Sequence, residues 1–402
     1  MRIRTRVAVV GAGPAGLVVA NTLQQAGIDT VVVESRSRAH VESRARAGLI
    51  EHRTVELLDA LGLAGRLREE GTVHGSCEFR HRGERFSVPY RELAGGRAHH
   101  VYPQQALVRD MITAHLDLGG RAHFSHPAVA VTGLDGDRAL VRCEPLPEAG
   151  EEPLEIECDF VAGCDGFHGV SRTTAAHRLT AHERRHEFGW LAVLAETPPA
   201  TEEIVYALHR DGFAGHMLRT PEVSRFYLQC PVGDRVENWP DERIWTALRR
   251  RLDMDETVLR EGPLIEKSMV DMRSVVTEPM QSGRLLLAGD AAHVISPAGG
   301  KGMNLAIADA AELSRRLIAH YQGDAGAPAG YSAARLPDIW RAQEFSHWML
   351  HLLHSPDPAE RDAAFLYRLQ LSRLAQLRDH PAYARNFADG YAGPWPGGCS
   401  VS

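Results

Sequence analysis

The sequence predicts an α/β fold organised on a parallel β-sheet, and neighbouring segments near the N-terminus carry this prediction. Arg6–Val10 is an apolar, β-branched run of strand length, which the glycine-rich segment Gly11–Gly16 interrupts. Leu17–Gln25 then shows helical apolar spacing, and Ile28–Glu34 is a second buried-strand pattern. A strand, a tight turn, a helix and a second strand form a βαβ unit, in which the two strands run parallel.

The composition is that of a globular protein with two or three domains. The 402 residues are 44% hydrophobic and 24% charged, which is enough apolar material for a large core. A net charge of -7 without a basic stripe argues against nucleic acid as a partner. No apolar run approaches a membrane span or a signal segment, so we expect a cytoplasmic protein without membrane contact. Six scattered cysteines without a CxxC pair predict reduced thiols and no metal site.

Downstream, short strand-like runs alternate with turns, and after Leu305 the sequence becomes helical as far as Leu374 and beyond. A Gly/Pro-rich tail ends the chain. The strand-like runs are Glu78–Val88, Val129–Cys143, Leu154–Ala162, Leu191–Glu196 and Ser224–Pro231.

The glycine turn of the βαβ unit has the pattern of a dinucleotide site. In GAGPAG, Gly11 makes the turn, Gly13 lets a pyrophosphate approach the backbone, and Gly16 allows the helix to pack on the strand. The helix N-terminus supplies N–H groups and partial positive charge for the phosphates. Glu34, at the end of the second strand, is placed to accept a hydrogen bond from a ribose hydroxyl. The alternative is a tight βα turn without a ligand.

Two later motifs favour FAD over NAD as the resident dinucleotide. CDGFHGVSR (164–172) follows an apolar strand, and RLLLAGDAAHVISPAGGKGMN (284–304) contains a buried strand that ends at Asp290. Asp290 can bond a ribityl or ribose hydroxyl. A helix beginning near Gly302 would aim its N-terminus at the flavin and stabilise negative charge on the reduced ring.

With these motifs the chain resembles, from end to end, the flavoprotein aromatic hydroxylases of the para-hydroxybenzoate hydroxylase type. Further strings that carry the resemblance are RARAGLIE (44–51), VYPQ (101–104) and the central segment 204–229. The resemblance implies a Rossmann-like FAD-binding fold of the glutathione-reductase type, with an inserted β-sheet substrate domain and a helical C-terminal region. It also implies a homodimer that hydroxylates a small aromatic acid with FAD, NADPH or NADH, and O2 through a flavin C4a-hydroperoxide.

The resemblance divides the chain into three parts. Residues 1–75, 102–175 and 268–320 form a discontinuous FAD-binding domain, 76–101 and 176–267 the substrate domain, and 321–402 the helical region and tail. The cofactor-binding residues it implies are Gly11, Gly13, Ala15, Gly16, Glu34, Arg44, Arg46, Ala47, Gly48, Leu49, Gln104, Asp165, Arg225, Asp290, Gly302, Met303 and Asn304.

For the substrate, the resemblance assigns phenol activation to Tyr206 and carboxylate binding to Arg219 and Tyr227. Tyr206, Tyr391 and His74 form a proton relay. Physical chemistry supports these roles, because removing the phenol proton enriches the ring for electrophilic attack and a guanidinium fork fits a carboxylate. Pro297 is expected at the catalytic centre and against the substrate.

Two positions depart from the family pattern for 4-hydroxybenzoate itself. Met217 stands where the family has a carboxylate-binding serine, and Ala298 stands where it has threonine. Loss of a hydroxyl donor weakens a carboxylate site and adds apolar surface. We therefore expect both residues in a reshaped substrate pocket, which suits a ring-substituted relative such as an aminohydroxybenzoate as well as the parent acid.

The nicotinamide co-substrate has candidate contacts of its own. An arginine cluster beside the nucleotide fold is a candidate for the 2'-phosphate of NADPH, although this segment also differs from the NADPH-preferring pattern, so NADH stays open. The cluster is Arg36, Arg38, Arg44 and Arg46, and His168 and Arg273 are further candidates.

Two other classes of function compete with the hydroxylase. A halogenase or a dehydrogenase would share the fold, but halogenase relatives carry GWxWxIP, whereas Gly189 and Trp190 continue here as LAVLAE. A non-catalytic binding module predicts a nucleotide fold without acid–base residues, which the tyrosines and Arg219 disfavour.

Overall fold

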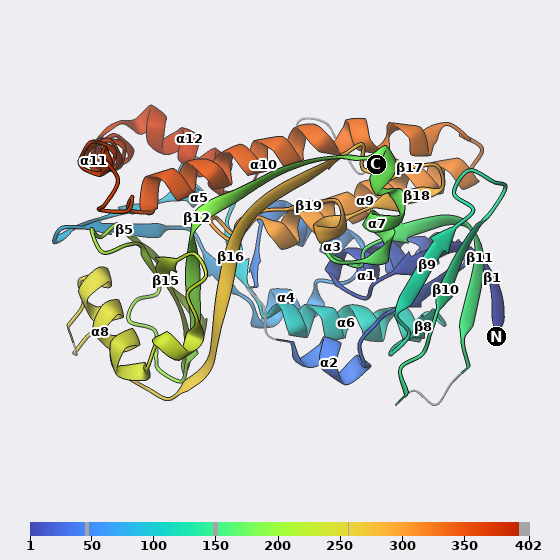
Figure 1. Ribbon diagram of the computed structural model, residues 1–402, viewed down its shortest axis with the longest axis horizontal. Helices are drawn as coiled ribbons and strands as arrows, with labels where there is room; N and C mark the ends of the chain where they lie inside the picture. Colours follow the sequence, from blue (N-terminus) through green and yellow to red (C-terminus); the bar gives the residue numbers. More distant parts are fainter. Residues whose placement is uncertain (45–47, 148–151, 256, 394–402) are drawn as a thin grey trace.

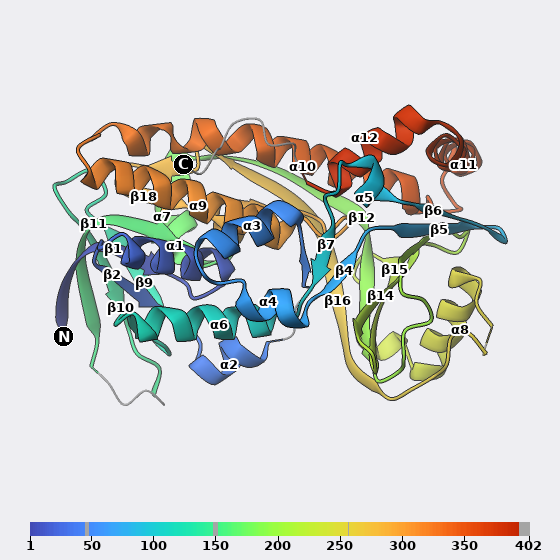
Figure 2. The same cartoon turned by 180° about the vertical axis from the view of Figure 1, so that it is seen from behind.

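The computed structural model describes residues 1–44, 48–147, 152–255 and 257–393. Two large sheets lie at opposite ends of an elongated molecule, and long strands and one long helix run between them (Figure 1). The helix is α10 (Tyr331–Leu353), and the strands are β12 (Thr180–Ala195) and β16 (Leu264–Glu278). Seen from behind, a small three-stranded sheet lies between the two ends (Figure 2).

The first large sheet confirms the predicted parallel βαβ unit. Its main path has the order β17-β18-β11-β1-β2-β8, and β1 pairs in parallel with both β2 and β11. An antiparallel hairpin of β9 and β10 extends it from β11. Its strands are β1 (Arg2–Val10), β2 (Thr30–Val33), β8 (Arg121–His123), β9 (Ala128–Thr132), β10 (Ala139–Cys143), β11 (Leu154–Gly163), β17 (Gln281–Ser282) and β18 (Leu285–Leu287).

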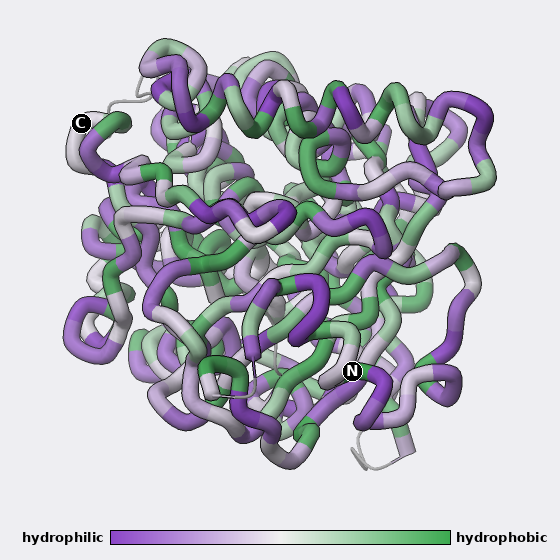
Figure 3. Tube along the Cα trace, turned by 90° about the vertical axis from the view of Figure 1, so that its left-hand side faces the viewer, coloured by the Kyte–Doolittle hydropathy of each residue, from purple (hydrophilic) through white to green (hydrophobic). Residues whose placement is uncertain are grey.

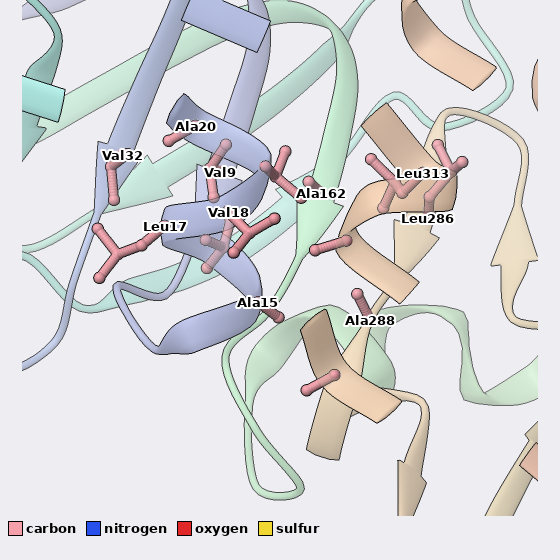
Figure 4. Close-up of a cluster of buried hydrophobic side chains, with 14 of the residues drawn as sticks. Val9, Ala15, Leu17, Val18, Ala20, Val32, Ala162, Leu286, Ala288 and Leu313 are labelled. Carbon is pink, nitrogen blue, oxygen red and sulfur yellow. The ribbon is translucent and has the colours of Figure 1, made fainter. Parts of the chain in front are cut away.

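Helices cover this sheet, and its strands are apolar on both faces, as is usual for parallel sheets. α1 (Pro14–Gln25), α6 (Gln104–Asp117) and α9 (Gly302–Tyr321) pack there. In the core, Val9, Val18 and Ala162 lie together with Leu286 and Leu313 (Figure 4). The smaller helices of this half are α2 (Arg38–Ser43), α3 (His52–Ala60), α4 (Gly65–Glu70) and α7 (Val170–Ala175).

The second large sheet has the order β19-β16-β12-β15-β14-β13-β5-β6. One face packs on α8 (Asp241–Leu252), while the other lies against the C-terminal helices α11 (Ala363–Asp379) and α12 (Pro381–Tyr391) and against α5 (Tyr90–Leu93). Polar segments of the trace mark many of the peripheral loops (Figure 3). The remaining strands are β5 (Cys77–His81), β6 (Glu84–Val88), β13 (Ile204–Ala207), β14 (Ala214–Thr220), β15 (Val223–Pro231) and β19 (His293–Val294).

Two features differ from the sequence-based expectation. β12 begins well before the predicted Leu191, because its first half is polar and exposed and is held by pairing with β16 rather than by an apolar pattern. The small sheet of β3 (Leu49–Ile50), β7 (His99–Val101) and β4 (Thr72–His74) was not predicted, since each strand is too short to show a period. The domain bounds stay a prediction.

His354 packs against the second sheet as a buried, neutral imidazole. Its Nε2 accepts a hydrogen bond from Trp190 Nε1 (2.6 Å), and its Nδ1 donates to the Leu350 carbonyl (3.0 Å). Trp190 in turn packs on Phe213, with ring centroids 5.0 Å apart. Burial lowers the pKa of His354 to about 3, so the imidazole is neutral at neutral pH.

Protonation of His354 should make stability depend on pH. Between pH ~6.5, the ordinary histidine pKa, and the folded-state value of about 3, the unfolded chain binds one more proton at this position. The free energy of unfolding should therefore fall as the pH drops through this window, with a contribution of up to ~1.4 kcal/mol per pH unit. Denaturant titrations of His354→Gln between pH 7 and 4.5 should give a shallower decline than wild type. Parallel declines would contradict the assignment.

Candidate active site

The glycine turn after β1 is tightly packed at Gly11 and Gly16 and open at Gly13. A Cβ added at Gly11 (φ +105°) would lie 2.4 Å from the Cys164 carbonyl oxygen, and one at Gly16 would lie 1.9 Å from the Gly11 oxygen. At Gly13, the N-cap of α1, an added Cβ meets nothing within 4 Å. The helix N-terminus thus faces open space without a side-chain cap, which suits a pyrophosphate.

Glu34 is held rigidly beside this turn. Its Oε2 accepts a hydrogen bond from the Ala12 amide (2.8 Å), and its Oε1 accepts from Ser35 Oγ (3.0 Å) and the Arg36 amide (2.9 Å). Because a carboxylate has about four lone-pair positions, one remains for a ribose hydroxyl. The side chain is thus pre-oriented for the predicted contact.

The second motif presents a carboxylate whose hydrogen bonding is incomplete. Asp165 follows β11, and its Oδ2 accepts from the Ser171 amide (2.9 Å). Its Oδ1 is buried without a hydrogen-bond partner in the described part of the chain, and burial raises the pKa of Asp165. Asp290 follows β18 and is exposed. Buried polar atoms are normally satisfied, so the orphaned oxygen fits a ligand that completes the site.

The third motif places the N-terminus of α9 beside β3. Lys301 is the N-cap residue, and its ammonium has no acceptor with which to cap the helix. Its Nζ instead donates to Glu51 Oε1 and to the Tyr391 carbonyl, both at 2.7 Å. Asn304 donates to the Leu49 carbonyl (3.0 Å) and accepts from the Glu51 amide (2.9 Å). The predicted cofactor residue Asn304 therefore fixes the backbone of β3 with its side chain, while Gly302 and Met303 begin the helix.

The other predicted cofactor residues lie around these motifs. Gly48 packs so closely on Tyr102 that an added Cβ would be 1.8 Å from its carbonyl oxygen. Gln104 is the first residue of α6, and Arg44 is the C-cap residue of α2. Arg46 and Ala47 lie outside the described residues.

Predicted substrate residues share one face of the second sheet. Tyr206 on β13 pairs with Gly215 on β14, which pairs with Tyr227 on β15. Two residues further along β14, Met217 pairs with Arg225 of β15. Residues two apart on a strand point to the same face. Tyr206, Met217, Arg225 and Tyr227 therefore share this face. Arg219 lies at an irregularity of the β14–β15 pairing and is close enough to Arg225 and Tyr227 for these groups to shift its pKa.

Charge and hydrophobicity are separated on this face. Burial, followed by the nearby charge of Arg225, lowers the pKa of Arg219, so two guanidinium groups make the region electropositive. Met217 (7% exposed) and Ala298 (2% exposed) belong to the same apolar cluster as Tyr206. Pro297, just before Ala298, is exposed. The face can hold an anionic group at one end and an apolar ring beside it.

Tyr206 and Tyr391 meet as the sequence predicted. Their hydroxyl oxygens are 2.8 Å apart, although the residues are 185 positions apart in the chain. Burial raises the pKa of both phenols, so both are neutral at physiological pH and either can donate the shared hydrogen bond. The pair joins the substrate sheet to the last turn of α12.

His74 is less directly connected than predicted. Its ring Nε2 has no hydrogen-bond partner among the described residues, and its backbone carbonyl accepts from the Tyr90 hydroxyl (2.6 Å). The rings of Tyr90 and His99 both pack against Tyr391, each with centroids 4.9 Å away. Sequence reasoning missed these two residues, because a tyrosine in a four-residue helix and a histidine in a three-residue strand form no recognisable motif.

Comparisons with known proteins agree with this geometry. Residues 4–346 match the family described as "FAD binding domain". The chain is 39% identical to p-hydroxybenzoate hydroxylase of Acinetobacter baylyi over 97% of its own length and 96% of that protein's. It is 27% identical to 3-amino-4-hydroxybenzoate 2-monooxygenase of Streptomyces platensis over 89% and 91% of the two chains. Its fold matches p-nitrophenol 4-monooxygenase of Pseudomonas putida with a TM-score of 0.83, at 20% identity over 98% and 99% of the chains.

The phosphate cradle, the orphaned carboxylate oxygen and the α9 N-terminus define an FAD-binding oxidoreductase, with FAD as its resident cofactor. The chain belongs to the family of FAD-dependent aromatic hydroxylases that includes p-hydroxybenzoate hydroxylase. No helix in the described ranges combines the length and apolarity needed to cross a bilayer. The five described cysteines are free thiols.

Two glycine substitutions should separate protein packing from cofactor binding. In Gly16→Ala the added methyl group collides with the Gly11 carbonyl, so the apoprotein should lose about 1–3 kcal/mol of stability together with its FAD affinity. In Gly13→Ala the methyl group enters open space, so apoprotein stability should stay near wild type while FAD binds at least tenfold more weakly. Thermal unfolding of the apoproteins and FAD fluorescence titrations measure the two effects. Equal FAD affinity in Gly13→Ala and wild type would argue against the cradle.

Proposed function

We propose that this protein hydroxylates a 4-hydroxybenzoate-type phenolic acid, using FAD, NADPH or NADH, and O2. One observation carries the proposal: one sheet face presents Tyr206, which is hydrogen-bonded to Tyr391 of α12, together with the arginine-rich region of Arg219 and Arg225. A para-hydroxylated benzoate has a phenol and a carboxylate at opposite ends of a flat apolar ring, which matches this arrangement.

The residues of the chain then divide the work. FAD, when bound, supplies the oxygen-transfer chemistry. Arg219 and Tyr227 bind the carboxylate, which orients the ring and leaves its phenol at Tyr206. Tyr206 accepts the phenol proton at Oη as its own proton passes to Tyr391 Oη, 2.8 Å away, and Tyr391 releases its hydroxyl proton toward His74, so neither tyrosine carries a lasting charge. The deprotonated ring is the more reactive form toward an electrophilic oxygen. Pro297 and Ala298 lie against the ring and exclude water.

The departures at Met217 and Ala298 support a substituted ring rather than the plain acid. Both side chains are buried and apolar where a hydroxyl would bind the carboxylate, so the pocket offers dispersion contacts instead of hydrogen bonds. The Streptomyces platensis relative is named for action on 3-amino-4-hydroxybenzoate. We therefore include amino- and hydroxy-substituted 4-hydroxybenzoates as substrates.

The nicotinamide site is proposed along the edge of the nucleotide fold. The Arg273 guanidinium lies 4.8 Å from the Phe167 ring centroid, and the His168 ring lies 5.0 Å from the same ring. Arg38 is tied to Glu42 (2.6 Å) on α2, next to Arg36. Each of these two groups of cationic side chains is a candidate for the phosphate groups of NADPH or NADH. We also propose that the protein is cytoplasmic and forms a homodimer. Analytical ultracentrifugation measures the oligomeric state.

Reduced-nicotinamide oxidation tests the proposal. The FAD-loaded protein should oxidise NADPH or NADH slowly alone and at least tenfold faster with 4-hydroxybenzoate or its 3-amino derivative, and mass spectrometry should find the product 16 mass units heavier. A flavoprotein that no phenolic acid stimulates would refute the substrate assignment. Stimulation without an added oxygen would refute hydroxylation.

Removal of one hydroxyl should uncouple the reaction. In Tyr206→Phe the bound phenol stays protonated, so we expect normal FAD binding, continued nicotinamide oxidation and at least tenfold less hydroxylated product per nicotinamide. Tyr321→Phe is the matched control, because its hydroxyl bonds Asp159 (3.1 Å) in the nucleotide half. An unchanged product ratio in Tyr206→Phe would remove Tyr206 from the proton path.

Truncation of the proposed carboxylate anchor should act mainly on binding. Arg219→Ala should raise the KM for 4-hydroxybenzoate at least tenfold. It should change the binding of 4-methylphenol, which lacks the carboxylate, by less than threefold. Changing Arg219 and the carboxylate of the ligand separately and together isolates the interaction between the guanidinium and the carboxylate. Similar losses for both ligands would assign Arg219 to pocket structure.

A further inference from the structure

A second histidine lies between Tyr391 and His74. His99 is on β7, is fully buried (0% exposed), and its ring packs edge-on against Tyr391 with an interplanar angle of 69°. Neither ring nitrogen makes a hydrogen bond of good geometry within the described part of the chain. Burying an imidazole with unused polar atoms is unfavourable, so the position calls for an explanation beyond packing.

The register of the small sheet places His99 next to His74. β7 and β4 lie side by side (Figure 2) and are antiparallel. His99 and His74 are directly opposite each other in the register, as are His100 and Val73. Side chains at opposite positions lie on the same face, with Cβ atoms about 5 Å apart. His99 therefore has Tyr391 on one side and His74 on the other. His74 lies on the edge strand of this sheet, and its neighbour Val73 is 51% exposed.

We infer that His99 is a relay residue that carries the phenol proton from Tyr391 to His74. The inference rests on the proposed function and completes its proton path as Tyr206, Tyr391, His99 and His74. The neutral imidazole accepts a proton from Tyr391 Oη at one ring nitrogen and releases the proton held at the other nitrogen to His74. One proton enters and one leaves, so His99 ends neutral with its proton on the other ring nitrogen, and the charges that remain are those of the substrate phenolate and of the proton passed to His74.

The charges around His99 favour transfer of a proton through its imidazole over retention of the proton there. Burial and the nearby ammonium of Lys301 lower the pKa of His99 well below its ordinary value, with smaller contributions from His74 and His100, while the Tyr391 carbonyl acts in the opposite direction. Tyr90, the other ring packed on His99, is a neutral phenol, because burial raises its pKa. A proton on His99 is therefore short-lived.

His74 is the better resting place for the proton. Burial also lowers the pKa of His74, but the carboxylates of Glu202 and Glu203 raise it in opposition. His99 has no carboxylate among the causes of its pKa shift and faces Lys301 instead. The electrostatic gradient thus runs from His99 toward His74.

His100 provides a matched control on the same strand. Alternate residues of a strand point to opposite faces, so His100 points away from Tyr391, and it pairs with Ile50 of β3 and Val73 of β4. Valine suits a buried strand at either position.

The experiment measures proton release when the FAD-loaded protein binds a phenol. Weakly buffered wild type, His99→Val, His99→Gln and His100→Val are mixed with 4-hydroxybenzoate or 3-amino-4-hydroxybenzoate in a stopped-flow instrument with a pH-indicator dye. Ultraviolet absorbance reports the bound phenolate, and flavin fluorescence gives the Kd. We expect both His99 variants to release the proton at least tenfold more slowly, with the Kd within twofold of wild type. His100→Val should match wild type.

The possible outcomes are distinguishable. Wild-type release rates in His99→Val and His99→Gln would overturn the inference and leave the proposed function standing. Wild type that binds both acids without ionising them would overturn the proposed function and the inference with it. Should the His99 variants also lose FAD, imidazole added to His99→Ala decides the matter: recovery of fast release supports the relay, and slow release with restored FAD overturns it.

Discussion

The parallel register of the first sheet is the constraint on which the site depends. Val10 pairs with Val33 and with Gly163, and Gly163 pairs with Leu287, so four strands end together at one edge. Each of the three cofactor motifs follows one of these ends. Segments that are more than 100 residues apart therefore converge on one ligand, at the edge where α/β sheets generally bind their cofactors.

The substrate half is connected to this edge by a few long-range contacts. β12 and β16 run between the two sheets, and their pairing sets the position of β15 and the substrate face. From the other direction, Lys301 binds both Glu51 and the carbonyl of Tyr391, so the start of α9, the segment after β3 and the end of α12 meet at one ammonium group. A buried ion pair of this kind specifies geometry more than it stabilises.

Local chemistry explains what could be predicted. Gly11 and Gly16 are required by backbone sterics that any sequence must obey, so their motif was readable, and the class of fold and the cofactor followed. The hydrogen bond between Tyr206 and Tyr391 was predicted by resemblance and is present. The first half of β12 was missed because pairing with β16, not apolar spacing, determines it. His99 was missed because its neighbours come from β4, α5 and α12, and only the tertiary fold brings them together.

The Lys301 ammonium has a mechanical consequence. The hydroxyl of Tyr391 is hydrogen-bonded to Tyr206, while its backbone carbonyl accepts from Lys301, the residue at the N-cap position of α9. Any shift of the α9 N-terminus would therefore be transmitted through Lys301 to the last turn of α12 and would change the alignment of the tyrosine pair. The N-terminus of α9 and the tyrosine pair cannot then vary independently through evolution: a mutation that moves one also moves the other, and compensating substitutions should cluster around Lys301.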